Sequence, residues 1–230
     1  MFWDPTYFLF ALPALLLAFY AQWKVRSTYE RYLKVPNSAR VTGLEAARTL
    51  QRSAGIAVRV EGTQGVLSDH YDPRTKVLRV SRSVAESASV GAVAIVAHEM
   101  GHALQDAEAF ALLRLRSGLV PVVNLTSWLG PILFVLGWML NLQPLAFLGV
   151  AFFGGAVVFS LLTLPVELDA SRRALDLLKR SGIVTDRKGL KGARSVLSAA
   201  ALTYVAALAQ ALSTMLYYIF LLGGQRRRRG

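Results

Sequence analysis

The chain of 230 residues contains no cysteine and only three histidines. The lack of cysteine excludes disulfide scaffolds and zinc or iron–sulfur sites with cysteine ligands. Charged residues are missing from three long segments, residues 5–23, 117–166 and 195–224, although the net charge of the whole chain is +12. Because a helix needs roughly 20 apolar residues to cross a bilayer, each segment is long enough for at least one crossing.

The longest uncharged segment predicts a helical hairpin in the membrane. A turn-forming sequence at 141–144 divides it into two spans, at about 118–140 and 145–166. The first apolar segment predicts an uncleaved anchor, because an acidic residue and no basic residue precedes it and its end is a poor cleavage site. We expect the chain to remain in the membrane.

The distribution of Lys and Arg predicts the orientation of the chain. Of 26 basic residues, 22 lie at 24–116 or 172–194. Basic segments are retained in the cytoplasm, so both are expected at the cytoplasmic face of a bacterial inner membrane. The last apolar segment conflicts with this rule, since a full crossing would place arginines 226–229 outside. One interpretation is that residues 195–212 pack against the cytoplasmic domain and 213–222 enter the lipid.

The first polar segment, residues 24–116, has the capping and turn residues expected of a small α+β domain. Thr42 and Glu45 form a capping box, which predicts a helix that ends near Gly55. Periodicity and turn residues predict four further elements. They are strands at 56–61 and 76–81, a turn at 69–73 and a long helix from about 85 to 110.

This long helix carries the sequence HEMGH, from His98 to His102. The two histidines lie about 40° apart and one turn of roughly 5.4 Å along the axis, so both imidazoles can reach one metal ion. Glu99 can accept a proton from a water molecule on that metal. The apolar residues 90–97 supply the buried helix that such a site needs. We therefore predict a site for one Zn²⁺ ion, with Glu99 as the general base.

A catalytic zinc takes three protein ligands and keeps one position open for water. The third ligand is not a later histidine, because none follows His102. The candidates are His70 and two carboxylates, Glu167 and Asp169, which return on the same side of the membrane. The carboxylates lie about 200° apart on a helix, so at most one of them faces the metal.

Substrate-binding residues are indicated less sharply. Peptide hydrolysis needs a donor for the developing oxyanion, and the chain offers His70, Tyr204 and Arg172 or Arg173. An exposed loop position for His70 and a packing role for Tyr204 are the alternatives. The strand residues 77–80 form either an edge strand that pairs with an extended substrate or an ordinary core strand.

The motif, the hairpin and the later sequence ELDAS resemble the gluzincin arrangement of the heat-shock membrane protease and CAAX prenyl protease group. In that group the third ligand is the first Glu of Glu-x-x-Ala-Asp, which corresponds to Glu167. The Asp of that motif is Ser171 here, so the carboxylate that would support a histidine ligand is replaced.

More of the chain resembles the YugP-like family of bacterial membrane neutral zinc metallopeptidases. The resemblance implies a membrane-embedded zinc protease with His98, His102 and Glu167 as metal ligands. The matching stretches span nearly the whole chain: DPTY (4–7), DHYDPR (69–74), AHEMGHALQD (97–106), LRLR (113–116), LPVE (164–167) and AAALTYV (199–205).

Together these features predict a mainly α, polytopic helical membrane protein with a small α+β cytoplasmic zincin-like catalytic unit. Five regions are expected: a transmembrane anchor at 1–23, a cytoplasmic α+β region with the motif helix at 24–117, a transmembrane hairpin at 118–166, a cytoplasmic helix with the third ligand at 167–194, and a C-terminal apolar helix, a fourth membrane segment, with a basic tail at 195–230.

The expected function is membrane-bound zinc endopeptidase activity on peptides or membrane proteins, with the lipid bilayer as a partner. Nucleic-acid binding is not expected, because the basic runs lack interleaved aromatic residues. An intramembrane protease is disfavoured because charged residues bracket the motif. A non-catalytic metal-binding scaffold or sensor is the other alternative, and Glu99 argues against it because a structural zinc needs no general base.

Overall fold

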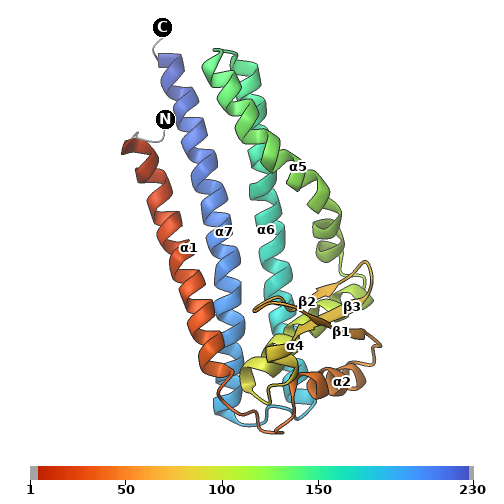
Figure 1. The fold of residues 1–230 in the computed structure, drawn as a ribbon. Coiled ribbons are helices and arrows are strands. Elements are labelled where there is room, and N and C mark those ends of the chain that lie inside the picture. The colour runs from red at the N-terminus through yellow and green to blue at the C-terminus, as the bar shows by residue number, and fades with distance from the viewer. Residues whose placement is uncertain (1–4, 228–230) are drawn as a thin grey trace. The chain divides into compact units, whose positions relative to one another are not determined.

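The computed structural model describes residues 5–227 and confirms a mainly helical chain with one small sheet (Figure 1). The helices of the described residues are α1 (Pro5–Tyr32), α2 (Gly43–Ala54), α3 (Arg82–Ala85), α4 (Val90–Ala107), α5 (Ala111–Met139), α6 (Gln143–Arg180) and α7 (Arg187–Arg227). The strands are β1 (Arg59–Thr63), β2 (His70–Asp72) and β3 (Val77–Ser81).

The chain divides into two compact units. Within the described residues, the helical unit comprises 5–21, 115–164 and 203–227, and the mixed unit comprises 22–114 and 165–202. Four helices, α1, α5, α6 and α7, contribute residues to both units. All the predicted metal ligands belong to the mixed unit.

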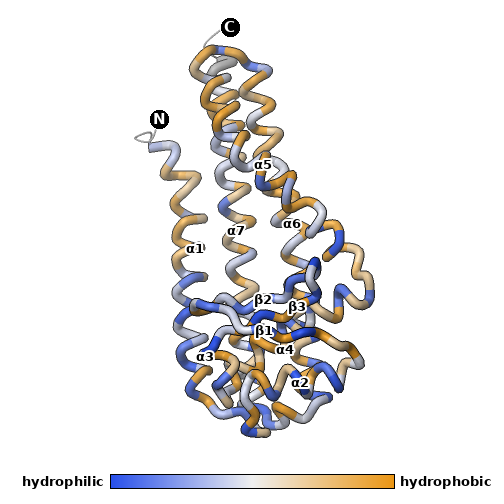
Figure 2. The backbone as a smooth tube through the Cα atoms, turned by 45° about the vertical axis from the view of Figure 1, so that its right-hand side comes forward, coloured by the Kyte–Doolittle hydropathy of each residue, from blue (hydrophilic) through white to orange (hydrophobic). Residues whose placement is uncertain are grey.

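By length and composition, α1, α5, α6 and α7 are candidate membrane spans among the described residues. Figure 2 shows hydrophobic residues along much of α5, and large apolar side chains such as Phe19 and Trp128 are 65% and 66% exposed. A surface of this kind is suited to hydrocarbon, where helices satisfy their own backbone hydrogen bonds. The fourth candidate span, α7, is the segment that the basic tail made ambiguous.

The predicted hairpin break is confirmed, since α5 ends at Met139 and α6 begins at Gln143. Asn141 adopts a φ of 56° in the turn, a left-handed conformation that Asn tolerates better than most residues. The two helices approach closely in the helical unit, because a Cβ at Gly137 would collide with the backbone of Ala146. Small residues at this contact are typical of helix pairs in membranes.

In the helical unit α7 contacts α1. The Ser213 hydroxyl donates to the Phe10 carbonyl oxygen at 2.5 Å, and the rings of Tyr7 and Tyr217 meet edge to face at 5.1 Å. The boundary between the units falls after Leu202, within the segment 195–212. The interpretation that 195–212 pack against the cytoplasmic domain and 213–222 enter the lipid stays a prediction. Asp4 and the arginines at 228 and 229 lie outside the described residues.

In the mixed unit the capping-box helix is confirmed as α2. The Thr42 hydroxyl accepts from the Glu45 N–H at 3.3 Å, and the Glu45 carboxylate accepts from the Thr42 N–H at 2.7 Å. Gly55 ends the helix with a φ of 67°, which a residue without a Cβ adopts readily. The expected long helix is shorter than predicted, because Ser89 caps α4 by accepting from the Ala92 N–H at 3.1 Å.

The sheet has the order β1-β3-β2, with β1 parallel and β2 antiparallel to β3. Residues 77–80, for which an edge strand and a core strand were the alternatives, therefore form the central strand. The edge strand β2 lies where a turn was expected. It has only three residues and forms by pairing with β3, assisted by the Asp69 carboxylate, which accepts from the Ser81 N–H at 2.7 Å.

Helix α4 forms the centre of the mixed unit, in contact with α2, α3 and the strands β2 and β3. Its first two turns, residues 90–97, are buried on almost every side. This explains why the sequence before the motif is continuously apolar rather than amphipathic. The burial fixes α4 in place and thereby positions the polar residues that follow.

Candidate metal centre

The structure brings together three of the predicted ligands, His98 and His102 on α4 and Glu167 on α6. One potential ligand atom from each lies within 4.8 Å of the others. The Glu167 Oε2 atom lies 3.2 Å from His98 Nε2 and 3.5 Å from His102 Nε2. Each imidazole therefore presents the same nitrogen to the carboxylate.

The two N–O distances fit a tetrahedral zinc site. Zinc bonds to nitrogen and oxygen are about 2.0–2.1 Å long, so ligand atoms at a tetrahedral angle lie about 3.3 Å apart. The two measured N–O separations, 3.2 and 3.5 Å, bracket that value. Two imidazoles and one carboxylate are also a ligand set typical of catalytic zinc, which leaves a fourth position for water.

The ligands approach because α4 and α6 touch at a residue without a side chain. A Cβ at Gly101 would lie 2.5 Å from the carbonyl oxygen of Ala170. Gly101 lies within the motif itself, and Ala170 is three residues after Glu167. Any larger residue at this contact would separate the helices that carry the two kinds of ligand.

The outer nitrogen of each imidazole also has a partner. His98 Nδ1 lies 3.3 Å from the Ser171 hydroxyl, and His102 Nδ1 lies 2.9 Å from Gln105 Oε1. Such partners leave Nε2 of each ring facing the metal position. Ser171, which stands where the resembling protease group has Asp, thus still contacts a predicted ligand. Gln105 is a site residue that our sequence reasoning missed.

The centre is largely buried and lies next to two carboxylates, Glu99 and Glu167. The Glu167 side chain is 2% exposed, and a buried carboxylate needs positive partners. Burial alone would lower the pKa of His102, but its hydrogen bond to Glu167 and the charges of Glu99 and Glu167 outweigh burial and raise that pKa. The protein therefore favours positive charge at this position, which a divalent cation would supply.

Glu99, the predicted general base, faces the edge strand β2. Its Oε2 accepts a hydrogen bond from the Tyr71 N–H at 2.9 Å. The Tyr71 hydroxyl donates to Asp106 at 2.7 Å. Asp106 lies two turns after Glu99 on α4, so the backbone and the side chain of Tyr71 both attach β2 to this helix. Burial and the contact with Asp106 raise the pKa of Tyr71. The backbone of Tyr71 is a second contact that the sequence did not reveal.

Asp169, the alternative carboxylate ligand, contacts Gln105 and Arg173 rather than the two motif histidines. Its Oδ2 accepts from Gln105 Nε2 at 2.9 Å and from Arg173 Nε at 2.6 Å. This agrees with the expectation that only one of the two carboxylates faces the histidines. Asp169 contacts the site through Gln105 instead.

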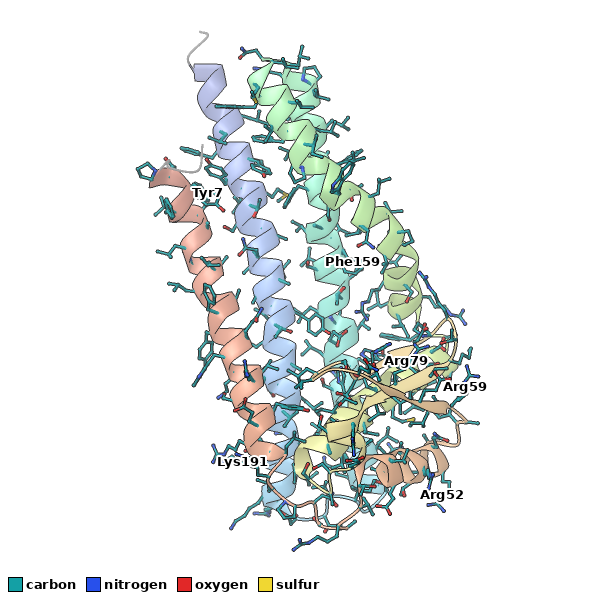
Figure 3. The ribbon with its side chains drawn as sticks, in the orientation of Figure 1. Tyr7, Arg52, Arg59, Arg79, Phe159 and Lys191 are labelled. Carbon is teal, nitrogen blue, oxygen red and sulfur yellow. The ribbon has the colours of Figure 1, made fainter. Side chains whose placement is uncertain are left out.

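The other predicted residues are not part of this group. His70 is exposed on β2, where its ring contacts the Ser68 carbonyl oxygen at 2.8 Å and the guanidinium of Arg79 at 3.4 Å. Arg79 lies on the neighbouring strand β3 and is labelled in Figure 3. Tyr204 lies on α7 in the helical unit. Arg172 is exposed on α6. An oxyanion role for any of these residues remains a prediction.

Comparisons with known proteins agree with this geometry. A sequence model of the family described as "Putative neutral zinc metallopeptidase" matches residues 7–223. The chain is 43% identical over 211 residues to a Bacillus subtilis (strain 168) protein named "Putative membrane protease YugP". The matched region covers 91% of this chain and 93% of that protein. No solved structure matches significantly. The chain belongs to this family of neutral zinc metallopeptidases.

Proposed function

We propose that the chain is a membrane-bound zinc endopeptidase that hydrolyses peptide bonds, with its site in the mixed unit. The observation that carries this proposal is the convergence of His98 Nε2, His102 Nε2 and Glu167 Oε2. Glu99 directly follows His98 on α4, and its charge acts on His102. The three ligands would hold one zinc ion. The family membership supports the same chemistry.

When bound, zinc would supply a Lewis acid that lowers the pKa of a water molecule towards about 7. The protein's own part is proton transfer. Glu99 has one oxygen held by the Tyr71 N–H, and its other oxygen is available to accept a proton from the attacking water. Glu99 then delivers that proton to the leaving amine, which a peptide bond requires because an amide anion is a poor leaving group.

A pocket lined in part by Tyr71, whose N–H contacts Glu99, suits a substrate side chain. Its volume is about 220 Å³. The lining residues are Ile56, Ala57, Val58, Tyr71, Lys76, Ala103, Asp106 and Ala107. Ala103 and Ala107 follow Glu99 by one and two helical turns, so the pocket lies on the same face of α4. A mainly apolar wall with an ion pair between Lys76 and Asp106 (3.4 Å) favours an apolar or uncharged side chain.

The decisive test separates metal binding from catalysis. Glu99→Gln should keep one zinc per chain but lower cleavage of an unfolded protein by about 10²- to 10⁴-fold, the usual effect of losing a general base. Glu86→Gln makes the same charge change at an exposed ion pair with Arg82 and should retain full activity. Metal content would be measured by elemental analysis and cleavage by gel assay, each with and without chelator.

Each result has a clear meaning. Full activity in Glu99→Gln would refute the general-base mechanism. Zinc bound by a wild-type chain that cleaves neither unfolded proteins nor membrane proteins would favour the scaffold or sensor alternative. Zinc stoichiometry unchanged in Glu167→Ala would refute Glu167 as the third ligand.

We also propose that the mixed unit faces the cytoplasm at the inner membrane. The supporting observation is that 22 of 26 basic residues lie at 24–116 and 172–194. The natural lack of cysteine permits a direct test with single cysteines and a membrane-impermeant maleimide. Cysteine at Asn141 should react in intact spheroplasts, and cysteine at Ser53 only after permeabilisation; the reverse would refute the orientation. Labelling at Gly224 in intact spheroplasts would establish a fourth full crossing.

A further inference from the structure

Gln105 is a buried polar residue whose amide oxygen and amide nitrogen both have hydrogen-bond partners. Its exposed fraction is 0%. The oxygen lies 2.9 Å from His102 Nδ1, and the nitrogen donates to the Val166 carbonyl oxygen and to Asp169 Oδ2, each at 2.9 Å. It therefore connects α4 with two residues that flank Glu167 on α6.

The surroundings permit only one orientation of this amide. If the amide were flipped, its oxygen would face the Val166 carbonyl oxygen and the Asp169 carboxylate, and all three atoms are acceptors. In the observed orientation the amide oxygen accepts, so His102 must donate its Nδ1–H. A histidine whose Nδ1 carries the proton binds a metal through Nε2, the atom that faces Glu167.

The carboxylate that fixes the amide is held in turn. Arg173 donates from Nε to Asp169 at 2.6 Å and from its terminal nitrogen to Glu108 at 2.7 Å. Its guanidinium also lies over the ring of Phe110 at 5.9 Å. Through Arg173, Asp169 is connected to Glu108 and Phe110, the residues that follow the end of α4.

We propose that Gln105 is a positioning residue for the metal centre and that Asp169 and Arg173 keep its amide in the orientation that His102 requires. This inference rests on the proposed function, because it assigns a role relative to the zinc ligands. Gln105 acts on the metal only through His102. Partners of this kind typically change metal affinity by about 10- to 100-fold.

The primary test compares zinc dissociation constants by competition with a chromophoric chelator in detergent. Gln105→Met keeps the side-chain length but removes the acceptor, and should weaken zinc binding by about 10- to 100-fold. Gln51→Met is the matched control, because Gln51 lies on α2 and its amide nitrogen donates to the Val58 carbonyl oxygen at 2.8 Å rather than to a residue of the metal centre. It should bind zinc as the wild type does.

A second pair of variants keeps the test valid if Gln105→Met does not fold. Asp169 is partly exposed, so its replacement is tolerated more easily. Asp169→Ala should weaken zinc binding by a smaller factor than Gln105→Met, because the amide keeps its bond to Val166. Asp169→Asn retains a carbonyl oxygen for Gln105 and should restore most of the lost affinity.

A spectroscopic readout addresses the orientation directly. With only three histidines, the Nδ1–H of His102 can be assigned in zinc-loaded protein labelled with ¹⁵N-histidine. That proton should be protected from exchange in the wild type and in Gln51→Met, exposed to exchange in Gln105→Met, and less protected than in the wild type in Asp169→Ala.

This inference alone would be overturned if the wild type binds zinc and Gln105→Met has the same zinc affinity and the same exchange of the His102 Nδ1–H. If Gln105→Met does not fold, the same results in Asp169→Ala would overturn it. A wild-type chain that binds no zinc would overturn the proposed metal centre together with it.

Discussion

Replacing Gly101 by alanine tests whether the contact between α4 and α6 sets the geometry of the metal centre. The added Cβ would lie 2.5 Å from the Ala170 carbonyl oxygen and 3.1 Å from its carbonyl carbon. Both are backbone atoms, so no side chain can rotate away. The helices themselves must move.

The alanine requires a movement of nearly 1 Å between the two helices. Ordinary contacts of a Cβ begin at 3.4 Å, so the Ala170 oxygen must retreat by about 0.9 Å. Functional groups must be held within about 0.5 Å of the productive geometry. Displacing Glu167 by nearly twice that amount would lengthen its separations of 3.2 and 3.5 Å from the histidines beyond those of a tetrahedral site.

The effect on stability should be smaller than the effect on metal binding. Overpacking typically costs about 1–3 kcal/mol, whereas alanine is favoured over glycine in a helix by about 1 kcal/mol. The net loss of unfolding free energy should therefore be about 0–2 kcal/mol. We expect a folded variant whose zinc affinity and cleavage rate both fall by at least tenfold.

The assay combines chelator competition for zinc with circular dichroism of the metal-free protein. Gly118→Ala in α5 is the control, because a Cβ there meets no atom within 4 Å. It should bind zinc normally and be slightly more stable. Wild-type zinc affinity in folded Gly101→Ala would refute the argument that this contact positions Glu167.

Four further outcomes are expected. Ser171→Asp should bind zinc more tightly and Ser171→Ala more weakly, because a carboxylate is a better partner than a hydroxyl for His98 Nδ1; chelator competition measures both. Tyr71→Phe should lose about 1–2 kcal/mol of stability. The raised pKa keeps Tyr71 protonated in the folded state, whereas Tyr71 of the unfolded wild type ionises above pH 10. The wild type therefore loses stability above pH 10 and Tyr71→Phe does not, so the stability difference between them should shrink in unfolding titrations. Ser213→Ala should cost about 0.6 kcal/mol in detergent unfolding, the average for such bonds in membranes. Zinc removal should leave the far-ultraviolet spectrum unchanged, since buried apolar residues hold α4 without metal.

The sequence was sufficient for features that depend on local pattern. The capping box predicted α2 between Gly43 and Ala54, and the 50-residue uncharged segment predicted the hairpin with its break near Asn141. The motif spacing placed His98 and His102 on one side of a helix. Each of these inferences uses periodicity or charge over neighbouring residues, which needs no knowledge of the tertiary fold.

Features that depend on distant contacts could not be predicted in the same way. Strand β2 has three residues, too few for a period-2 signal, and it exists because residues 70–72 pair with β3. Gln105 was visible only as part of a sequence that resembles a family. Its function depends on Val166 and Asp169, which are about 60 residues away in the chain.

The register of α6 on α4 is determined by several independent contacts, and this explains how one carboxylate of two is selected. As the numbering rises along α4, the partners on α6 fall: His98 meets Ser171, His102 meets Glu167, and Gln105 meets Val166. Shifting α6 by one residue would rotate its face by about 100° and break all three contacts at once. The spacing of Glu167 and Asp169 alone leaves this rotation open. The polar contacts between the two helices fix it, so the same side chains that orient the histidines also choose the third ligand.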